Sequence, residues 1–161
     1  AHADPACRHR VESMFYAQGI CPSRLCLLPM TATTHEHLSM YSKVDIGLDP
    51  FPYAGTTTTC EALYMGVPVV TLAAPVGADF HAQNVGAALL TCIGHEELVA
   101  RSEMQYVEIA QRLAGDTKAL RAIRARLRDD FESSALGQRA RYLTNVETMC
   151  REMINEACQK V

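Results

Sequence analysis

The stretch over residues 45–72, DIGLDPFPYAGTTTTCEALYMGVPVVTL, constrains the fold of this chain more than any other. Residues 44–48 form a short, mostly apolar run that ends in turn-forming residues, which predicts a buried strand. Pro50 and Pro52 end this strand, because a proline cannot donate a hydrogen bond to the ladder of a central strand. Residues 69–72 are β-branched and apolar, and they predict the next buried strand.

A turn and a helix connect these two predicted strands. Ala54 and Gly55 allow a sharp turn into a run of threonines, and a short helix is predicted over residues 59–65. Gly66 ends that helix where a left-handed residue is favoured, and Pro68 follows shortly after. Strand, turn, helix and strand form a βαβ unit, whose crossover makes the two strands parallel.

The rest of the chain continues in the same alternating pattern. Upstream, the sequence predicts a helix over 8–18, a strand over 25–28 and a short helix over 36–42. Downstream, it predicts helical segments over 87–90, 96–100, 103–113, 116–131 and 138–158, with a linker over 133–137. We therefore expect an α/β fold with a parallel sheet flanked by helices and a helical C-terminal part.

The last predicted helix carries an apolar stripe at helical spacing. Its members are Leu143, Val146, Met149, Met153 and Ala157. Methionines in such a stripe fill core gaps more often than they form a binding surface, so the stripe predicts a buried face.

The turn before the short predicted helix carries the chemistry. A helix N-terminus offers unpaired N–H groups and a partial positive charge, the threonine hydroxyls add donors, and Gly55 permits close approach of a phosphate. The turn matches neither GxGxxG nor GxxxxGK[ST]. The alternative is a capping box in which Glu61 reaches back to Thr58. A functional Glu61 has to face hydroxyl groups such as those of ribose, because a carboxylate repels a pyrophosphate.

Composition excludes several classes of partner. A chain of 161 residues suits one domain with a real core, and a formal charge of -3 gives no reason to expect nucleic acid. No apolar run approaches membrane-spanning length, so no membrane partner is expected. The seven cysteines are scattered without a CxxC, which favours reduced thiols in a cytoplasmic or nuclear protein over disulfides or zinc.

LDPFPYAGTTTTCEALYMGVPVVTL resembles the O-GlcNAc transferase/SPINDLY family of protein O-glycosyltransferases. The resemblance extends to residues 28–29, 35–37, 81–86, 89–91 and 97–100. It implies a GT-B fold, in which two Rossmann-like lobes hold a nucleotide-sugar donor between them. Residues 1–161 then correspond to a single nucleotide-sugar-binding C-terminal lobe, a fragment that is incomplete at its N-terminus and is expected not to transfer sugar by itself.

The resemblance also implies a set of donor contacts. The expected nucleotide-sugar-binding residues are Ala32, Thr34, His37, Gly55, Thr56, Thr57, Thr58, Glu61, His81 and Asn84. For His37 the alternative is a surface or capping role, and for His81 and Asn84 it is ordinary loop anchoring. His35 and His37 are two residues apart, but no carboxylate or thiol cluster follows to complete a metal site.

The family's chemistry is metal-independent and inverting, so no metal and no cofactor is expected beyond the nucleotide sugar itself. The resemblance places the acceptor-side catalytic groups and the contacts with acceptor proteins before Ala1, so no catalytic residue is assigned. Thr56, Met40 and the segment 81–86 resemble the SPINDLY branch of O-fucosyltransferases, which favours GDP-fucose over UDP-GlcNAc. The competing hypotheses are a UDP-GlcNAc-dependent transferase, a non-catalytic nucleotide-binding or scaffold module, and an unrelated α/β phosphate-binding protein.

Overall fold

The computed structural model describes residues 4–77 and 80–159, and the chain divides into two compact units, Ala1–Met40 and Tyr41–Val161. The first unit contains helix α1 (Pro5–Ala17), the 3-10 helix η1 (Pro22–Arg24) and helix α2 (Thr34–Ser39). A second 3-10 helix, η2 (Met40–Lys43), leads into the second unit.

The first unit has little buried surface. Helix α1 begins after Asp4, whose side chain accepts a hydrogen bond from the N–H of Ala6, and none of its side chains is buried. The strand predicted over residues 25–28 is wrong, because among the described residues this segment has no neighbouring strand to pair with. Instead, the carbonyl of Leu27 accepts a hydrogen bond from the guanidinium of Arg8 at 3.3 Å. An apolar run alone does not supply the ladder that a strand requires.

The second unit is built on a three-stranded parallel sheet in the order β1-β2-β3. Its strands are β1 (Gly47–Leu48), β2 (Val69–Leu72) and β3 (Val99–Ala100). Gly47 pairs with Val69, and Thr71 pairs with Val99. The βαβ prediction is confirmed, although β1 is shorter than predicted and β3 occupies part of the segment predicted as helical.

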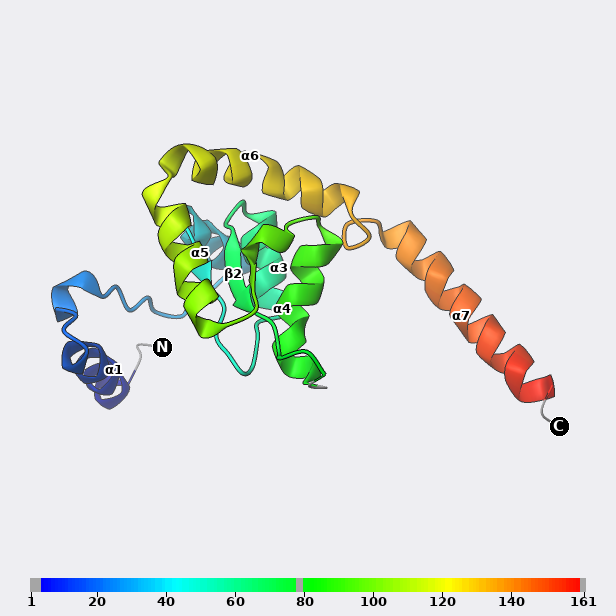
Figure 1. Ribbon diagram of the computed structural model, residues 1–161, viewed down its shortest axis with the longest axis horizontal. Helices are drawn as coiled ribbons and strands as arrows, with labels where there is room; N and C mark the ends of the chain where they lie inside the picture. Colours follow the sequence, from blue (N-terminus) through cyan, green and yellow to red (C-terminus); the bar gives the residue numbers. More distant parts are fainter. Residues whose placement is uncertain (1–3, 78–79, 160–161) are drawn as a thin grey trace. The chain divides into compact units, whose positions relative to one another are not determined.

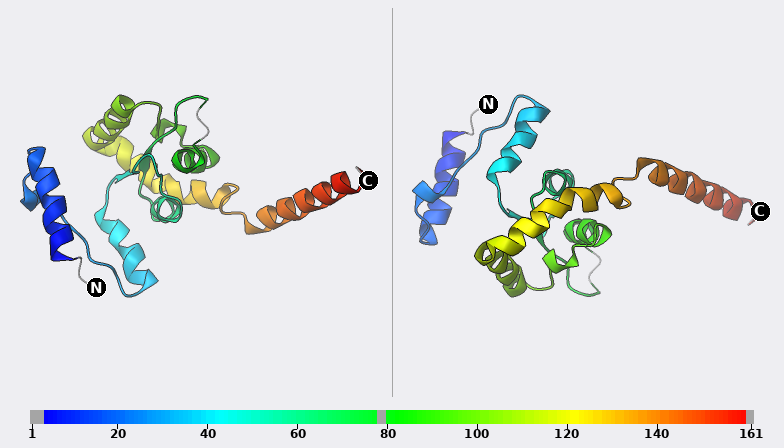
Figure 2. Two further views of the ribbon diagram at one scale, coloured as in Figure 1. Left: turned by 90° about the horizontal axis from the view of Figure 1, so that it is seen from below. Right: turned by 90° about the horizontal axis from the view of Figure 1, so that it is seen from above.

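Helices cover both faces of this sheet. Helix α3 (Thr57–Tyr64) connects β1 to β2, and helix α4 (His81–Cys92) with the 3-10 helix η3 (Glu96–Leu98) connects β2 to β3. Figure 1 shows α3 and α4 on one side of β2 and helix α5 (Glu103–Gly115) on the other, and both views in Figure 2 agree. All four residues of β2 are buried, so this central strand lies in the core.

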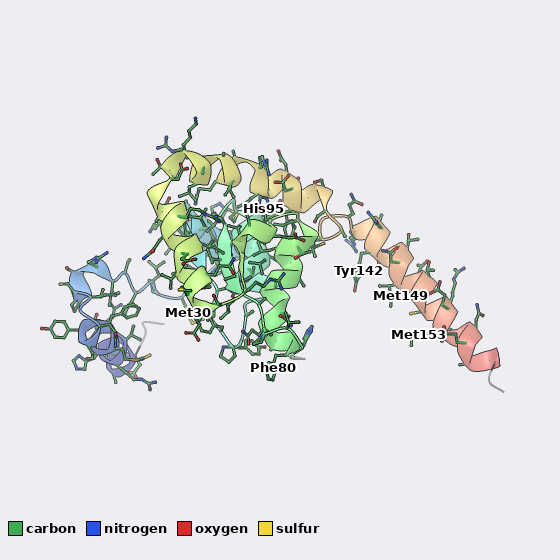
Figure 3. The ribbon with its side chains drawn as sticks, viewed as in Figure 1. Met30, Phe80, His95, Tyr142, Met149 and Met153 are labelled. Carbon is green, nitrogen blue, oxygen red and sulfur yellow. The ribbon has the colours of Figure 1, made fainter. Side chains whose placement is uncertain are left out.

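Helix α6 (Thr117–Ser133) lies at the amino end of β1. The guanidinium of Arg124 donates to the carbonyls of Val44 and Asp45, just before the strand, at 2.8 and 2.9 Å. The carboxyl ends of the parallel strands lie at the opposite edge, where the connections to α3 and α4 begin. The labelled side chains Phe80 and His95 in Figure 3 flank the two ends of α4.

Helix α7 (Arg139–Gln159) differs from its prediction in burial. Every side chain described on it is exposed, including Met149 at 60% and Met153 at 67%, both labelled in Figure 3. The buried stripe predicted there is wrong in this structure, because no described element packs against it. Among the described helices, none combines the length and hydropathy that a membrane-spanning segment requires.

Candidate functional site

The N-terminus of α3 has no side-chain cap. Its N-cap residue, Thr56, has φ -115° and ψ -76° and makes no side-chain cap hydrogen bond. Side-chain caps normally need an extended backbone at this position, which explains why the threonine does not form one. Within the described residues, no hydrogen bond takes up the N–H groups of Thr57, Thr58 and Thr59. These first-turn donors therefore point out of the helix without a partner from the part of the chain that the structure describes.

The predicted capping box of Thr58 with Glu61 is wrong. The helix begins at Thr57, two residues before the predicted start, so Glu61 lies beyond the positions that can cap it. The Glu61 carboxylate instead accepts a hydrogen bond from the hydroxyl of Tyr41 at 3.2 Å. The alternative in which Glu61 caps the start of this helix is therefore excluded.

Helix α4 also begins without a side-chain cap, after Phe80. Neither α3 nor α4 has an acidic residue in its first turn. By contrast, the side chains of Asp4, Thr33, Ser102 and Asp116 cap the helices α1, α2, α5 and α6. Missing caps are thus a feature of the two helices that follow β1 and β2.

These two helix starts lie side by side. The N–H of Ala54, in the turn before α3, donates to the carbonyl of Ala82 in the first turn of α4 at 3.0 Å. A hollow of about 460 Å³ beside the turn is lined by Pro52, Phe80, His81, Ala82 and Gln83. Two partial positive charges and a set of unused N–H donors therefore meet at the carboxyl edge of the sheet, which is the arrangement that binds phosphate groups.

The Gly55 turn rests on a buried carboxylate. Asp49 is 4% exposed, and its Oδ1 accepts a hydrogen bond from the N–H of Gly55 at 2.7 Å. A Cβ atom at Gly55 would lie 2.7 Å from Oγ1 of Thr59 and 2.8 Å from Oγ1 of Thr58. The turn therefore requires glycine for its own packing, and a side chain at this position would distort the turn as well as any ligand contact.

The hydroxyl of Tyr41 holds the Glu61 carboxylate next to the first turn of α3. The same hydroxyl lies 3.3 Å from the carbonyl oxygen of Thr58. Burial, and then the charge of Glu61, raise the pKa of Tyr41 to about 12, so the phenol remains a neutral donor. Burial followed by the same carboxylate raises the pKa of the Cys60 thiol, which does not favour a reactive thiolate at this site.

Comparison with known proteins assigns the chain to a family. Residues 5–146 match the family described as Glycosyl transferase family 41. The chain belongs to glycosyl transferase family 41. The resemblance inferred from the turn and the expected α/β architecture of a GT-B lobe are both confirmed.

Several relatives show which members of family 41 the chain is similar to. It is 46% identical over 151 residues to a tomato (Solanum lycopersicum) protein called "Probable UDP-N-acetylglucosamine--peptide N-acetylglucosaminyltransferase SPINDLY". The Arabidopsis thaliana protein of the same description is 43% identical over 152 residues. A Caenorhabditis elegans UDP-N-acetylglucosamine--peptide N-acetylglucosaminyltransferase is 32% identical over 136 residues. The tomato match covers 94% of this chain and 16% of the relative, and the Arabidopsis match covers the same shares. The worm match covers 84% of this chain and 11% of that protein.

A solved structure from family 41 has the same fold. It is a mutant of the Thermobaculum terrenum O-GlcNAc transferase, which superimposes with a TM-score of 0.87 at 37% sequence identity. The match covers 98% of this chain and 29% of that chain. The family 41 chain described here therefore spans only a small part of the proteins to which it is similar.

Within this family 41 chain, most predicted site residues surround the two helix starts. Gly55, Thr56, Thr57, Thr58 and Glu61 come from the turn and α3, and His81 and Asn84 come from the first turn of α4. The hydroxyl-bearing residues at positions 56–58 and His81 are exposed. Their contacts with a donor stay a prediction.

Asn84 has a structural partner. Its Oδ1 accepts a hydrogen bond from the N–H of Ala74 at 2.9 Å, which ties α4 to the segment after β2. This agrees with the alternative of loop anchoring for the amide oxygen, while the side-chain NH₂ group is the part of Asn84 left for a sugar or phosphate.

Three predicted donor contacts belong to the first unit. The N–H of Ala32 donates to the carboxylate of Glu36 at 3.0 Å, Thr34 begins α2, and His37 lies in its last turn. Thr33 and Glu36 form a capping box at the start of α2, which was not predicted. Contact of Ala32, Thr34 and His37 with a donor nucleotide stays a prediction.

Sequence reasoning missed the residues that support the turn. Asp49, Thr71 and Tyr41 act through side-chain hydrogen bonds to partners 6 to 22 positions away in the sequence. The only local signal was the position of Asp49 directly after β1, at the edge where functional side chains of parallel sheets gather. Among the described residues, no group of three or more His, Cys, Asp or Glu side chains is arranged to hold a metal ion.

Proposed function

We propose that this chain is the donor-binding lobe of a protein O-glycosyltransferase, which transfers a sugar from a nucleotide sugar to Ser or Thr hydroxyls of proteins. The observation that carries the proposal is the pair of uncapped helix starts, α3 and α4, within the region that matches family 41. A non-catalytic nucleotide-binding module would use the same donors, so transfer has to be measured on the full-length protein together with binding.

The proposed contribution of this lobe is electrostatic. When the bond between the sugar and the diphosphate breaks, negative charge builds up on the departing diphosphate. The N–H groups at the start of α3 are held by the helix before the reaction, and together with the hydroxyls of Thr56, Thr57 and Thr58 they stabilise that charge. Glu61, held by Tyr41, accepts hydrogen bonds from ribose hydroxyls at the far side of the turn. No metal is required in this scheme, and the acceptor proteins are cytoplasmic or nuclear.

We propose GDP-fucose as the donor. The family resemblance implies that Met40 stands at a position where animal O-GlcNAc transferases have an arginine that contacts uracil, and Thr56 and the segment 81–86 resemble the SPINDLY branch. Identities of 41–46% to SPINDLY proteins against 32% to the worm transferase support that branch. The second candidate is UDP-GlcNAc, since the descriptions of the SPINDLY relatives name it. Loss of a charge-assisted bond to uracil costs about 1.5–3 kcal/mol, which is about tenfold or more in affinity.

The nucleotide-binding site is tested by replacing Thr57 and Thr58 together with alanine and measuring GDP and UDP binding by titration calorimetry. Each hydroxyl that donates to a charged phosphate contributes about 1.5–3 kcal/mol, so binding should weaken at least tenfold. Thr117→Ala, at the first position of α6, is the matched control and should bind normally. Wild-type affinity in a folded double variant would refute the site, and UDP displacing the donor as well as GDP does would refute GDP-fucose.

A further inference from the structure

We propose that Asp49 is the positioning residue of the diphosphate site. In this inference, which rests on the proposed function, its buried carboxylate orients the Gly55 turn so that the first N–H groups of α3 face the donor's diphosphate. The carboxylate does not touch the ligand and acts through the backbone of the turn. The ligand class that depends on it is a nucleoside diphosphate.

The backbone of Asp49 is fixed independently of its side chain. Its N–H donates to the carbonyl of Val70 in β2 at 2.9 Å, and its carbonyl accepts from the hydroxyl of Tyr106 in α5 at 2.9 Å. Burial, and then Asp49, raise the pKa of Tyr106, so this phenol remains a donor at neutral pH. The sheet and α5 thus provide a rigid base from which the carboxylate extends.

Both carboxylate oxygens are engaged. Oδ1 accepts from the N–H of Gly55 at 2.7 Å, and Oδ2 accepts from Oγ1 of Thr71 in β2 at 2.7 Å. Gly86 of α4 packs directly against this pair, because a Cβ atom there would collide with Oδ2 of Asp49 and Oγ1 of Thr71. The carboxylate is therefore bonded to a strand and a turn, and a helix packs against it.

A buried carboxylate is not what stability alone would select at this position. No ion pair links Asp49 to a Lys, Arg or His among the described residues, so its charge is offset by hydrogen bonds alone. Removing a charge from water is costly, and an apolar side chain would fill the same space without that cost. The feature that an apolar residue could not provide is an acceptor aimed at the N–H of Gly55.

The direction of the Gly55 N–H group determines which N–H groups of the turn face the solvent. The N–H of Ala54 points to α4, where it binds the carbonyl of Ala82, and the next N–H, of Gly55, points inward to Asp49. The two successive peptide planes that end at Ala54 and at Gly55 are thereby fixed just before the helix start. The N–H groups of Thr57, Thr58 and Thr59 are then the donors that remain for an anion, in an orientation set before the ligand arrives.

The test compares four variants of the full-length protein: Asp49→Ala, Asp49→Asn, Thr71→Val and Tyr106→Phe. Asparagine can accept from Gly55 and donate to the threonine hydroxyl, so Asp49→Asn should bind GDP and UDP within about threefold of wild type. Asp49→Ala should lose at least tenfold. Tyr106→Phe removes only a bond to the backbone of Asp49, and it is expected to lower the melting temperature with affinity changed less than about threefold. Thr71→Val frees Oδ2 but leaves the acceptor for Gly55 in place, so it should weaken affinity by less than Asp49→Ala does.

Asp49→Leu is made alongside Asp49→Ala in case the alanine variant fails to fold, since leucine fills the space without an acceptor. Wild-type affinity in either folded variant would overturn the inference. It is also overturned if affinity falls in proportion to melting temperature across all the variants, because that describes a purely structural residue. If Thr57→Ala/Thr58→Ala binds normally, the proposed site itself fails. If that pair binds weakly while Asp49→Ala binds normally, only the role of Asp49 fails.

Discussion

Gly86 is expected to respond to alanine in the direction opposite to its helix propensity. It lies within α4, where alanine is normally favoured over glycine by about 1 kcal/mol. In this structure, however, an added Cβ would collide with Oδ2 of Asp49 and Oγ1 of Thr71, and it would lie 3.0 Å from the Cβ of Thr71. Overpacking of this kind costs about 1–3 kcal/mol. Because the neighbours are tied to each other and to the sheet, we take the upper value, which gives a net loss of about 2 kcal/mol after the propensity gain.

Gly115→Ala is the matched control for this substitution. Gly115 is the last residue of α5, and nothing lies within 4 Å of the position of its Cβ. Gly115→Ala should therefore stabilise the protein slightly, whereas Gly86→Ala should lower the melting temperature by about 4–8 °C. Thermal unfolding followed by circular dichroism measures both. A Gly86→Ala variant at least as stable as wild type would refute the packing argument, and so would equal losses in the two variants.

Three further predictions concern side chains around the site and the core. The phenol of Tyr41 should ionise with a midpoint of about 12 rather than near its usual value of about 10, as measured by the ultraviolet absorbance difference between wild type and Tyr41→Phe. Because folding favours the neutral phenol, the raised pKa of Tyr41 stabilises the folded state fully below a pH of about 10, and this stabilisation is lost as the pH rises towards about 12. A titration midpoint near 10 would contradict the prediction. Glu61→Gln should weaken nucleotide binding without lowering the melting temperature, and unchanged affinity in calorimetry would exclude the ribose contact. His95 is 1% exposed, and its ring nitrogens lie 2.8 Å from Glu97 and 3.0 Å from Asp130. His95→Phe should lower the free energy of unfolding, measured in guanidinium, by about 1–3 kcal/mol. An unchanged free energy of unfolding would show that both contacts are dispensable.

The fold could be predicted largely from sequence, because its main signals are local. The run of residues 44–72 contains two apolar segments, a turn and a helix-ending glycine, and each of these patterns depends only on near neighbours. The strand over 25–28 and the buried stripe of α7 were predicted from equally clear patterns, yet neither has a partner in the described chain. A pattern specifies which face is apolar, and pairing or burial depends on what is placed against it.

The candidate site, too, was predictable where its signals are local and not where it depends on tertiary contacts. The threonines of the turn were predicted because a helix start after a glycine turn is visible in the sequence. The support from Asp49 was not, because Thr71 lies 22 residues from it and Gly86 lies on the next helix. The capping box at Thr58 was predicted because the residue types match the motif, but the N-cap of the helix is Thr56, two residues earlier. Residue types reveal where donors are, but tertiary contacts decide which way they point.

The N-terminus of α3, which has no side-chain cap, allows a substitution that should change stability and ligand binding in opposite directions. Thr57→Asp places a negative charge at the first position of the helix, where it should stabilise the fold by about 0.3–1 kcal/mol through the helix dipole. The same charge would oppose a bound diphosphate by about 3 kcal/mol, for unit charges about 5 Å apart at an effective dielectric constant of about 20. Thr117→Asp makes the same change at the first position of α6, where the nearby Asp116 reduces the gain and no ligand is expected. We therefore expect Thr57→Asp to raise the melting temperature while reducing GDP or UDP affinity about a hundredfold, and Thr117→Asp to leave affinity unchanged. Equal affinities in the two variants would show that the α3 N-terminus does not face the diphosphate, whatever its lack of a cap suggests.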